Sequence, residues 1–392
     1  MSLRGVKRRG NLPAGVLWIS LASLFTDIAG EAVYPILPLY LTSLGASPAI
    51  LGLVEGVAET TASLLKLFSG WWSDRLGRSK PLVLVGYSTA VLAKGALTLA
   101  TTWPQVLLLR FADRFGKGVR GAPRDAWLSR ISTNEELPRV YGFHRAMDNT
   151  GAVLGPLCSA AFLALYPGNY RSLFLWTLIP GFIAVICLLV PKEKSFKKAS
   201  RTEITPTSPG LRRFVLVLGL FTLANSADAF LILRLKEAGW ATALIPLTWA
   251  ALHVVKVAGN LISHRLVEKW NPKQLLAAGW IYYAGIYLAV GWLQHPLALA
   301  LAVVGYGIFF GMTEGPERTL VARLSPSRSR GKGFGVYALS TALPALPASV
   351  LFGLLWQRYG SAYAFTIEAA LAATAGLILF LLPLPAVSER KD

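Results

Sequence analysis

Apolar residues recur along this chain in long runs separated by short polar segments. A helix rises about 1.5 Å per residue, so about 20 apolar residues cross the ~30 Å hydrocarbon core of a bilayer. Runs of this length predict membrane-spanning helices. The predicted spans, twelve in all, cover residues 16–41, 49–72, 81–100, 104–125, 142–165, 172–190, 214–235, 241–262, 274–293, 297–318, 334–356 and 362–383.

The composition changes this picture little. Hydrophobic residues make up 54% of the 392 residues and charged residues only 15%, against roughly 25% in soluble domains. A bilayer accommodates this apolar excess, because lipid-facing surface can be apolar. The first span is too long for a cleavable signal peptide and carries Asp27 and Glu31, so we expect it to remain in the protein.

The basic residues, which give a formal net charge of +19, lie in alternate loops. This positive-inside pattern predicts that both termini are cytoplasmic. It also argues against nucleic acid as a partner, and we expect an integral protein of a bacterial cytoplasmic (inner) membrane. The basic segments are the N-terminal stub and residues 74–80, 124–145, 192–213, 264–273 and 318–332.

The longest polar segment, 191–213, separates six predicted spans from six and is expected to be a cytoplasmic linker. The two halves, 1–190 and 214–392, repeat short patterns in the same order. Leu24-Phe25-Thr26, for example, returns as Leu220-Phe221-Thr222. Chance similarity between two hydrophobic halves is the alternative. A parallel repeat predicts two six-helix bundles that rock against each other around a site near the bilayer midplane.

The segment GWWSDRLGRSK, residues 70–80, joins the second and third predicted spans. It resembles the signature G-x-x-x-D-R-x-G-R-K-K of the major facilitator superfamily, with a serine in place of one basic residue. Chemically, a glycine permits a tight turn and a carboxylate at a helix end can pair with arginine. The resemblance implies the all-α, twelve-helix, two-bundle fold of that superfamily. It also implies a cytoplasmic gate that includes Gly70, Asp74, Arg75, Gly77 and Arg78.

Two further segments are similar to patterns of the same superfamily. Residues 110–118 are similar to R-x-x-Q-G-x-G, which is associated there with proton transfer, although Asp113 and Arg114 depart from the pattern. The fifth span resembles the antiporter signature found mainly in exporters, and ordinary packing through small residues is the alternative. The resemblance therefore favours export, through a motif that consists of Gly142, Gly151, Gly155 and Pro156.

Carboxylates occur inside the first two spans. Asp27 and Glu31 are four residues apart and share a helix face, as do Glu55 and Glu59. Ionisable groups at bilayer depth are costly, so they usually face a cavity or a partner. Neighbouring carboxylates in a low dielectric resist ionising together, which suits groups that load and release protons. The alternative is a set of structural ion pairs with arginines of the fourth span.

A charged stripe follows the fourth span and covers a face about 100–120° wide. Because a lipid-facing stripe would be prohibitive, we expect these residues to line a cavity and the cytoplasmic gate. Internal salt bridges without substrate contact are the alternative. The stripe consists of Arg110, Asp113, Arg114, Lys117, Arg120 and Arg124.

The second half supplies further candidates. By the internal repeat, Glu317 corresponds to Arg124 and Arg318 to Asp125, so the two helix ends could pair across the inner gate. A solvated helix end is the alternative. The remaining gate candidate is Glu314, and the remaining cavity candidates are Lys66, Asn225, Asp228, His253 and Lys256.

We therefore expect a secondary active transporter that works by alternating access and exports a small organic molecule by proton-coupled antiport. Proton-coupled uptake of a small organic acid or siderophore, and a non-transporting receptor on the same fold, are the alternatives. We find no nucleophile–base constellation, phosphate loop or zinc-ligand spacing, so we expect no enzyme activity, no metal and no cofactor beyond the proton gradient. The expected partners are the substrate, protons and the lipid bilayer, with the protein as a monomer.

Overall fold

The computed structural model describes residues 12–133, 135–193, 195, 208–326 and 330–384, without the side chains at 264, 265, 268, 330 and 331. The basic N-terminal stub and most of the predicted linker lie outside the described residues. The helices are α1 (Ala14–Val33), α2 (Leu37–Ser43), α3 (Pro48–Leu76), α4 (Lys80–Ala96), η1 (Leu97–Leu99), α5 (Trp103–Arg130), α6 (Leu137–Leu165), α7 (Tyr170–Trp176), α8 (Leu178–Leu189), α9 (Pro209–Leu223), α10 (Ala229–Glu237), α11 (Leu244–Lys269), α12 (Pro272–Trp292), α13 (Pro296–Gly305), α14 (Gly307–Leu324), α15 (Arg330–Tyr359) and α16 (Ser361–Leu381).

These helices coincide with the predicted spans, and several spans consist of two consecutive helices. Within the described residues, nine segments are long and apolar enough to cross a membrane. The span formed by α5 is not among them, and it carries the charged stripe. The span formed by α6 begins with a polar segment, and the span formed by α9 and α10 is interrupted at residues 224–228. The fold is therefore the predicted all-helical membrane architecture.

Local sequence explains where several helices begin and end. The Ser47 side chain accepts a hydrogen bond from the Ile50 amide at the start of α3, and Gly77 ends that helix with a φ of 65°. This left-handed conformation suits glycine, so the tight turn predicted at position 77 is present. Ser208 caps α9, which begins at Pro209. The helix therefore starts before Arg213, the residue at which the linker was expected to end.

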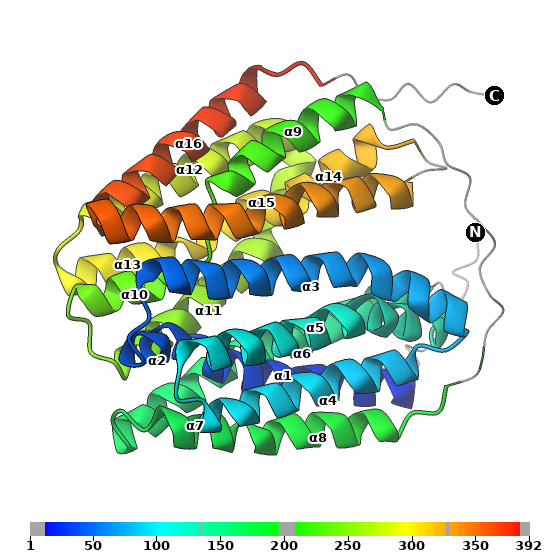
Figure 1. Cartoon of the computed structure of the whole chain (residues 1–392). Helices are drawn as coiled ribbons and strands as arrows, with labels where there is room; N and C mark the ends of the chain where they lie inside the picture. Colours follow the sequence, from blue (N-terminus) through cyan, green and yellow to red (C-terminus); the bar gives the residue numbers. More distant parts are fainter. Residues whose placement is uncertain (1–11, 134, 194, 196–207, 327–329, 385–392) are drawn as a thin grey trace, which may run out of the picture.

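The helices form two groups that meet along α3 and α15 (Figure 1). Helices α1–α8 pack in one group, called here the first bundle, and α9–α16 form the second bundle (Figure 1). We call the end at which α1 begins the terminal end, and the opposite end, with the 44–47 turn, the far end. A second contact between the bundles is made by α6 and α11.

The backbones of α3 and α15 approach each other most closely in the half of α3 near the far end. A side-chain carbon at Gly52 would lie 2.1 Å from the Ser349 carbonyl oxygen, and one at Gly353 would lie 2.3 Å from the Pro48 carbonyl oxygen. Towards the terminal end, by contrast, the side chain of Trp71 on α3 is 55% exposed. The bundles are therefore tightly closed at the far end.

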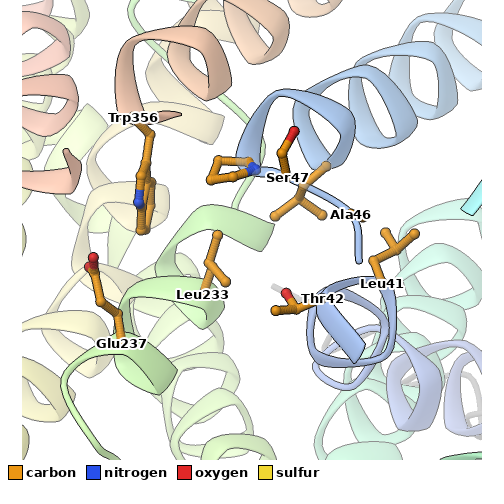
Figure 2. A pocket seen from close by; sticks show the side chains of 9 residues that line it. Leu41, Thr42, Ala46, Ser47, Leu233, Glu237 and Trp356 are labelled. Atoms are coloured by element: carbon orange, nitrogen blue, oxygen red, sulfur yellow. The ribbon is translucent and has the colours of Figure 1, made fainter. Parts of the chain in front are cut away.

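A small cavity of about 140 Å³ remains in this closed junction. Figure 2 shows side chains from the end of α2, the start of α3, α10 and α15 around it, with Glu237 and Trp356 on one side. It lies at the far end, away from the charged residues of α5. The residues predicted to line a central cavity lie elsewhere, on α1, α3, α5 and α11 among other helices.

Candidate transport site

The buried centre of the first bundle contains an ion pair between α3 and α5. Arg110 donates from Nε to Glu55 Oε1 at 2.9 Å and from Nη2 to Glu55 Oε2 at 2.8 Å. The Glu55 side chain is only 1% exposed. A two-point contact of this kind compensates both charges in a low-dielectric surrounding. For Glu55, the structure therefore favours the ion-pair alternative over an accessible proton carrier.

Asp113 extends this network to α4. Its carboxylate accepts a hydrogen bond from Lys94 Nζ and another from Arg110 Nη1 at 3.3 Å, and Arg114 Nε lies 3.9 Å away. Lys94 was not among the predicted site residues. The signal that identified the carboxylates, an ionisable residue inside an apolar span, would have found it as well.

Glu59 and Lys117 lie at the accessible edge of the network, next to the buried Arg114. Arg114 Nη2 is 3.5 Å from Glu59 Oε1, and the Glu59 side chain is 45% exposed. Lys117 is also exposed, although it interacts electrostatically with Glu59, Glu31 and Asp27. Charged side chains at this depth avoid lipid. We therefore interpret their exposure as an opening towards the space between the bundles.

The glycines of the antiporter-like motif position two carboxylates of α1. A side-chain carbon at Gly151 would lie 2.8 Å from Asp27 Cβ, and one at Gly155 would lie 3.0 Å from Glu31 Cβ. Gly142 is different, because nothing lies within 4 Å of a carbon placed there. Close helix packing thus accounts for two of the glycines only. Pro156 lies inside α6, next to Gly155.

Glu31 links the two bundles. Trp249 Nε1 on α11 donates a hydrogen bond to Glu31 Oε2 at 3.1 Å, and His253 Nε2 lies 3.4 Å from the same oxygen. The Tyr34 ring lies 5.2 Å from the Trp249 ring. Glu31 and His253, which were predicted as separate cavity candidates, are therefore brought together across the junction.

In the second bundle, the predicted candidates Asn225 and Asp228 lie in the non-helical segment between α9 and α10. Tyr306 donates a hydrogen bond to Asp228 Oδ1 at 3.0 Å. The Ser226 amide and hydroxyl donate to the Glu368 carboxylate at 3.0 and 2.9 Å. Glu368 on α16 is only 3% exposed, and sequence reasoning missed it despite its place inside an apolar span.

Lys256 and Glu314 are also brought together. Lys256 Nζ lies 3.1 Å from Glu314 Oε1 and 3.7 Å from the centre of the Phe310 ring. Asn260 Nδ2 donates to the other oxygen of Glu314 at 3.2 Å. Lys256, predicted for the cavity, and Glu314, predicted for the gate, are therefore members of one cluster between α11 and α14.

At the terminal end, the predicted gate residues contact other parts of the first bundle. Asp74 Oδ1 accepts a hydrogen bond from Arg130 Nη2 at 3.2 Å, and the Arg75 guanidinium lies 5.0 Å from the Trp71 ring. Arg78 is exposed. A side-chain carbon at Gly70 would meet Ala122 Cβ only at 3.5 Å, which is ordinary van der Waals contact. Gly70 is therefore not needed for close helix approach.

The expected pairing of Arg124 with Glu317 is not formed in this structure. Arg124 Nη1 donates to Ser23 Oγ at 2.7 Å, and its Nη2 lies 3.2 Å from Asp125 Oδ1. Glu317 instead accepts a hydrogen bond from Tyr337 at 2.9 Å. Three other predicted residues lie outside the clusters described above. Lys66 and Arg318 are exposed, and the buried Arg120 guanidinium lies 4.1 Å from the centre of the Tyr87 ring.

The residues described so far belong to a membrane protein of two helical bundles, and charged side chains of one bundle contact residues of the other. The sequence matches the model of the Major Facilitator Superfamily over residues 19–349. The chain is also 30% identical over 378 residues to an uncharacterised MFS-type transporter of Methanocaldococcus jannaschii, with 94% of each chain covered. The protein therefore belongs to the major facilitator superfamily, as the resemblance of the 70–80 segment implied.

Other relatives are more distant. A multidrug resistance protein, MdtH of Yersinia pestis, is 24% identical over 349 residues, with 84% of this chain and 83% of the relative covered. Solved structures of the same fold include the nucleoside transporter NupG, with a TM-score of 0.81, 11% identity and coverage of 93% and 99%. A bacterial homologue of the lysosomal transporter Spinster has a TM-score of 0.78, 16% identity and coverage of 95% and 97%. At these identities, the likeness to the solved structures shows the fold alone.

Proposed function

We propose that this protein is a proton-coupled antiporter that exports a small organic molecule by alternating access. Residues 1–190 and 214–392 would move as two bundles around the central charged site. The observation that carries the proposal is the contact of Glu31 in the first bundle with Trp249 and His253 in the second. This contact has to break when the bundles separate at the far end, so the state of the Glu31 carboxylate is linked to the conformation.

We place both termini in the cytoplasm of a bacterial inner membrane, with the protein as a monomer. The basic loops support this orientation through the positive-inside rule. The terminal end is then cytoplasmic, and the structure, closed at the far end, corresponds to an inward-facing state. The substrate would enter from the cytoplasm and reach the exposed charges of Glu59 and Lys117, with the buried Arg114 beside Glu59.

Export is supported by two observations. The relatives include multidrug resistance proteins at 24% identity, and the packing of α6 on α1 places Gly151 and Gly155 of the antiporter-like motif against Asp27 and Glu31. Asp27, Glu31 and Glu59 are the proposed proton-binding groups, because each is less tightly paired than Glu55.

The test uses the purified full-length protein in liposomes that contain a pH-sensitive dye. Ethidium and a panel of small metabolites and drugs are added one at a time. For an antiporter, a transported compound moves protons in the opposite direction, and replacement of Asp27 by Asn abolishes the proton signal. Proton movement in the same direction as the compound would indicate uptake by symport. Binding of a compound without any transport would indicate a receptor, and compound transport without proton movement would remove the coupling from the proposal.

A further inference from the structure

A second polar cluster lies inside the first bundle, between α1, α5 and α6. It includes His144 and Asp148, which are one helical turn apart on α6. His144 follows the start of α6 at Leu137 by about 10 Å along the helix axis, at about 1.5 Å per residue. Asp148 lies one turn deeper, in the direction of Asp27. The cluster therefore extends from the terminal end of the bundle towards its centre.

Direct contacts connect the members of this cluster. His144 Nδ1 lies 3.2 Å from Ser20 Oγ on α1, and His144 Nε2 lies 3.7 Å from Asp148 Oδ1. The other oxygen of Asp148 is 3.9 Å from Arg124 Nη2. Gly151, one helical turn after Asp148 on α6, lies against Asp27, because a side-chain carbon at Gly151 would be 2.8 Å from Asp27 Cβ. The three titratable residues Asp27, Asp148 and His144 thus follow one another from the centre of the first bundle towards the terminal end, and we call them the series.

Several polar atoms of the cluster are buried without a hydrogen bond in the protein. They are His144 Nε2, Asp148 Oδ1 and Arg120 Nη1. The side chains of His144 and Asp148 are only 5% and 13% exposed. A buried polar atom without a partner is costly, and a water molecule commonly bridges such atoms when they are too far apart for a direct bond. The 3.7 Å between the two atoms of His144 and Asp148 exceeds a hydrogen-bond length.

Charged groups on the neighbouring helices bear on this series; those of α11, which packs on α6, include His253 and Lys256, which contact Glu31 and Glu314. Arg120, Arg124 and Asp125 face it from α5, and Arg145 faces it from α6. Tyr87 of α4 lies under Arg120, and Glu31 interacts with Asp27 along α1. Helix α8, which packs on another side of α1, carries no Asp, Glu, Lys, Arg or His between Leu178 and Leu189.

The alternative exit for a proton from Asp27 passes through the opening between the bundles. Arg114 and Lys117 lie on that side. Positive charge does not separate the two routes, because Arg120, Arg124 and Arg145 face the cluster as well. The cluster behind Asp27, however, supplies a carboxylate and an imidazole, which are the side chains that most often transfer protons near neutral pH.

We propose that Asp148 and His144 relay protons between Asp27 and the cytoplasm inside the first bundle, separately from the substrate opening. The O–H bond of the protonated Asp27 carboxyl breaks, and a proton is added to the Asp148 carboxylate through intervening water. Asp148 then passes a proton to Nε2 of neutral His144. The resulting imidazolium releases one proton to cytoplasmic water, so Asp148 and His144 return to their initial forms and Asp27 is left as a carboxylate. The inference rests on the proposed proton coupling.

The experiment follows the pH-driven change of conformation, which needs no substrate. The full-length protein in lipid nanodiscs carries Leu76→Cys and Phe334→Cys, two exposed positions at the terminal ends of α3 and α15, with Cys158 and Cys187 replaced by Ser. A fluorophore pair on the new cysteines reports the distance between the bundles after a rapid pH jump. His144→Gln and Asp148→Asn are the test variants, and His295→Gln, an exposed histidine in the loop before α13, is the matched control.

We expect His144→Gln and Asp148→Asn each to slow the transition by at least about tenfold. This threshold is cautious, because a positioned proton donor or acceptor typically accelerates a proton transfer by about 10²–10⁴-fold. The starting and final distances should remain those of the parent, and added imidazole buffer should restore part of the rate in His144→Gln. Parent-like rates in both folded variants would overturn the relay. If the parent itself shows no pH-driven change, or if Asp27→Asn leaves that change intact, the proposed coupling fails at Asp27. Thermal unfolding identifies a variant that fails to fold, and the second variant then decides.

Discussion

Gly155 of α6 lies directly against Glu31 of α1. A side-chain carbon at position 155 would be 3.0 Å from Glu31 Cβ and 2.6 Å from the Ile28 carbonyl oxygen. The latter distance is far below van der Waals contact, and the atom that would have to move belongs to the backbone. The glycine therefore sets how close α6 approaches the helix that carries two proposed proton-binding residues.

Replacement of Gly155 by Ala should destabilise the protein by about 1–3 kcal/mol, because an added methyl group in a packed interface forces the helices apart. The matched control is Gly142→Ala in the same motif, where nothing lies within 4 Å of the added carbon. This control should be stabilised by about 0.5–1 kcal/mol through the better helix propensity of alanine. Unfolding in mixed micelles measures both. Equal stability of the two variants would contradict the close packing of α1 on α6.

Arg110 holds two buried carboxylates, so its removal should be among the most damaging single changes in the first bundle. We expect Arg110→Gln to cost about 3–5 kcal/mol, because Glu55 loses its partner although its side chain is only 1% exposed. The control is Asp74→Asn, which removes an ion pair whose carboxylate is 47% exposed and should cost about 0–1 kcal/mol. Similar losses in the two variants, measured by unfolding in mixed micelles, would show that the Arg110 network is not structural.

Most of the fold could be predicted from the sequence, because bilayer thickness fixes the length of an apolar span. The predicted span 274–293, for instance, became α12 at Pro272–Trp292. The interruption at 224–228 was not predicted. It depends on tertiary contacts. In a continuous helix, the Ser226 amide would donate a hydrogen bond to a carbonyl oxygen one turn earlier, whereas here it donates to the Glu368 carboxylate on α16. Contacts of this kind join residues far apart in the sequence and leave no local pattern.

The candidate site was predictable by residue type but not by partner. An ionisable residue inside an apolar span identified Asp27, Glu31 and His253, and the same rule would have found Lys94. Which charges meet is decided by helix rotation and by the approach of the bundles. Arg124 was expected to pair with Glu317, yet it donates a hydrogen bond to Ser23 within its own bundle, and Glu317 accepts one from Tyr337.

Glu368 closes the interruption between α9 and α10 by accepting two hydrogen bonds from Ser226. Replacement by Ala should cost about 1–3 kcal/mol, because the Ser226 amide would remain buried without an acceptor. Replacement by Gln keeps one oxygen acceptor and should cost less. Thermal unfolding of both variants provides the measurement. If Glu368→Gln were as unstable as Glu368→Ala, the carboxylate would have a role beyond accepting these bonds.

The link between Glu31 and the second bundle should bias the protein towards the state closed at the far end. Glu31→Gln weakens the contacts with both Trp249 and His253, and at about 1 kcal/mol per hydrogen bond each lost contact should raise the population of the far-end-open state about fivefold.

Leu51, which lines the far-end cavity and is 3% exposed, provides the reporter as Leu51→Cys. A membrane-impermeant maleimide added from outside should label it faster in the Glu31→Gln background. The matched control is Glu237→Gln. Glu237 borders the same cavity, but it pairs with Arg234 of its own bundle at 3.5 Å. In this control background, the cysteine at position 51 should be labelled at the parent rate. Equal labelling of the two variants would show that the Glu31 contact does not hold the bundles together.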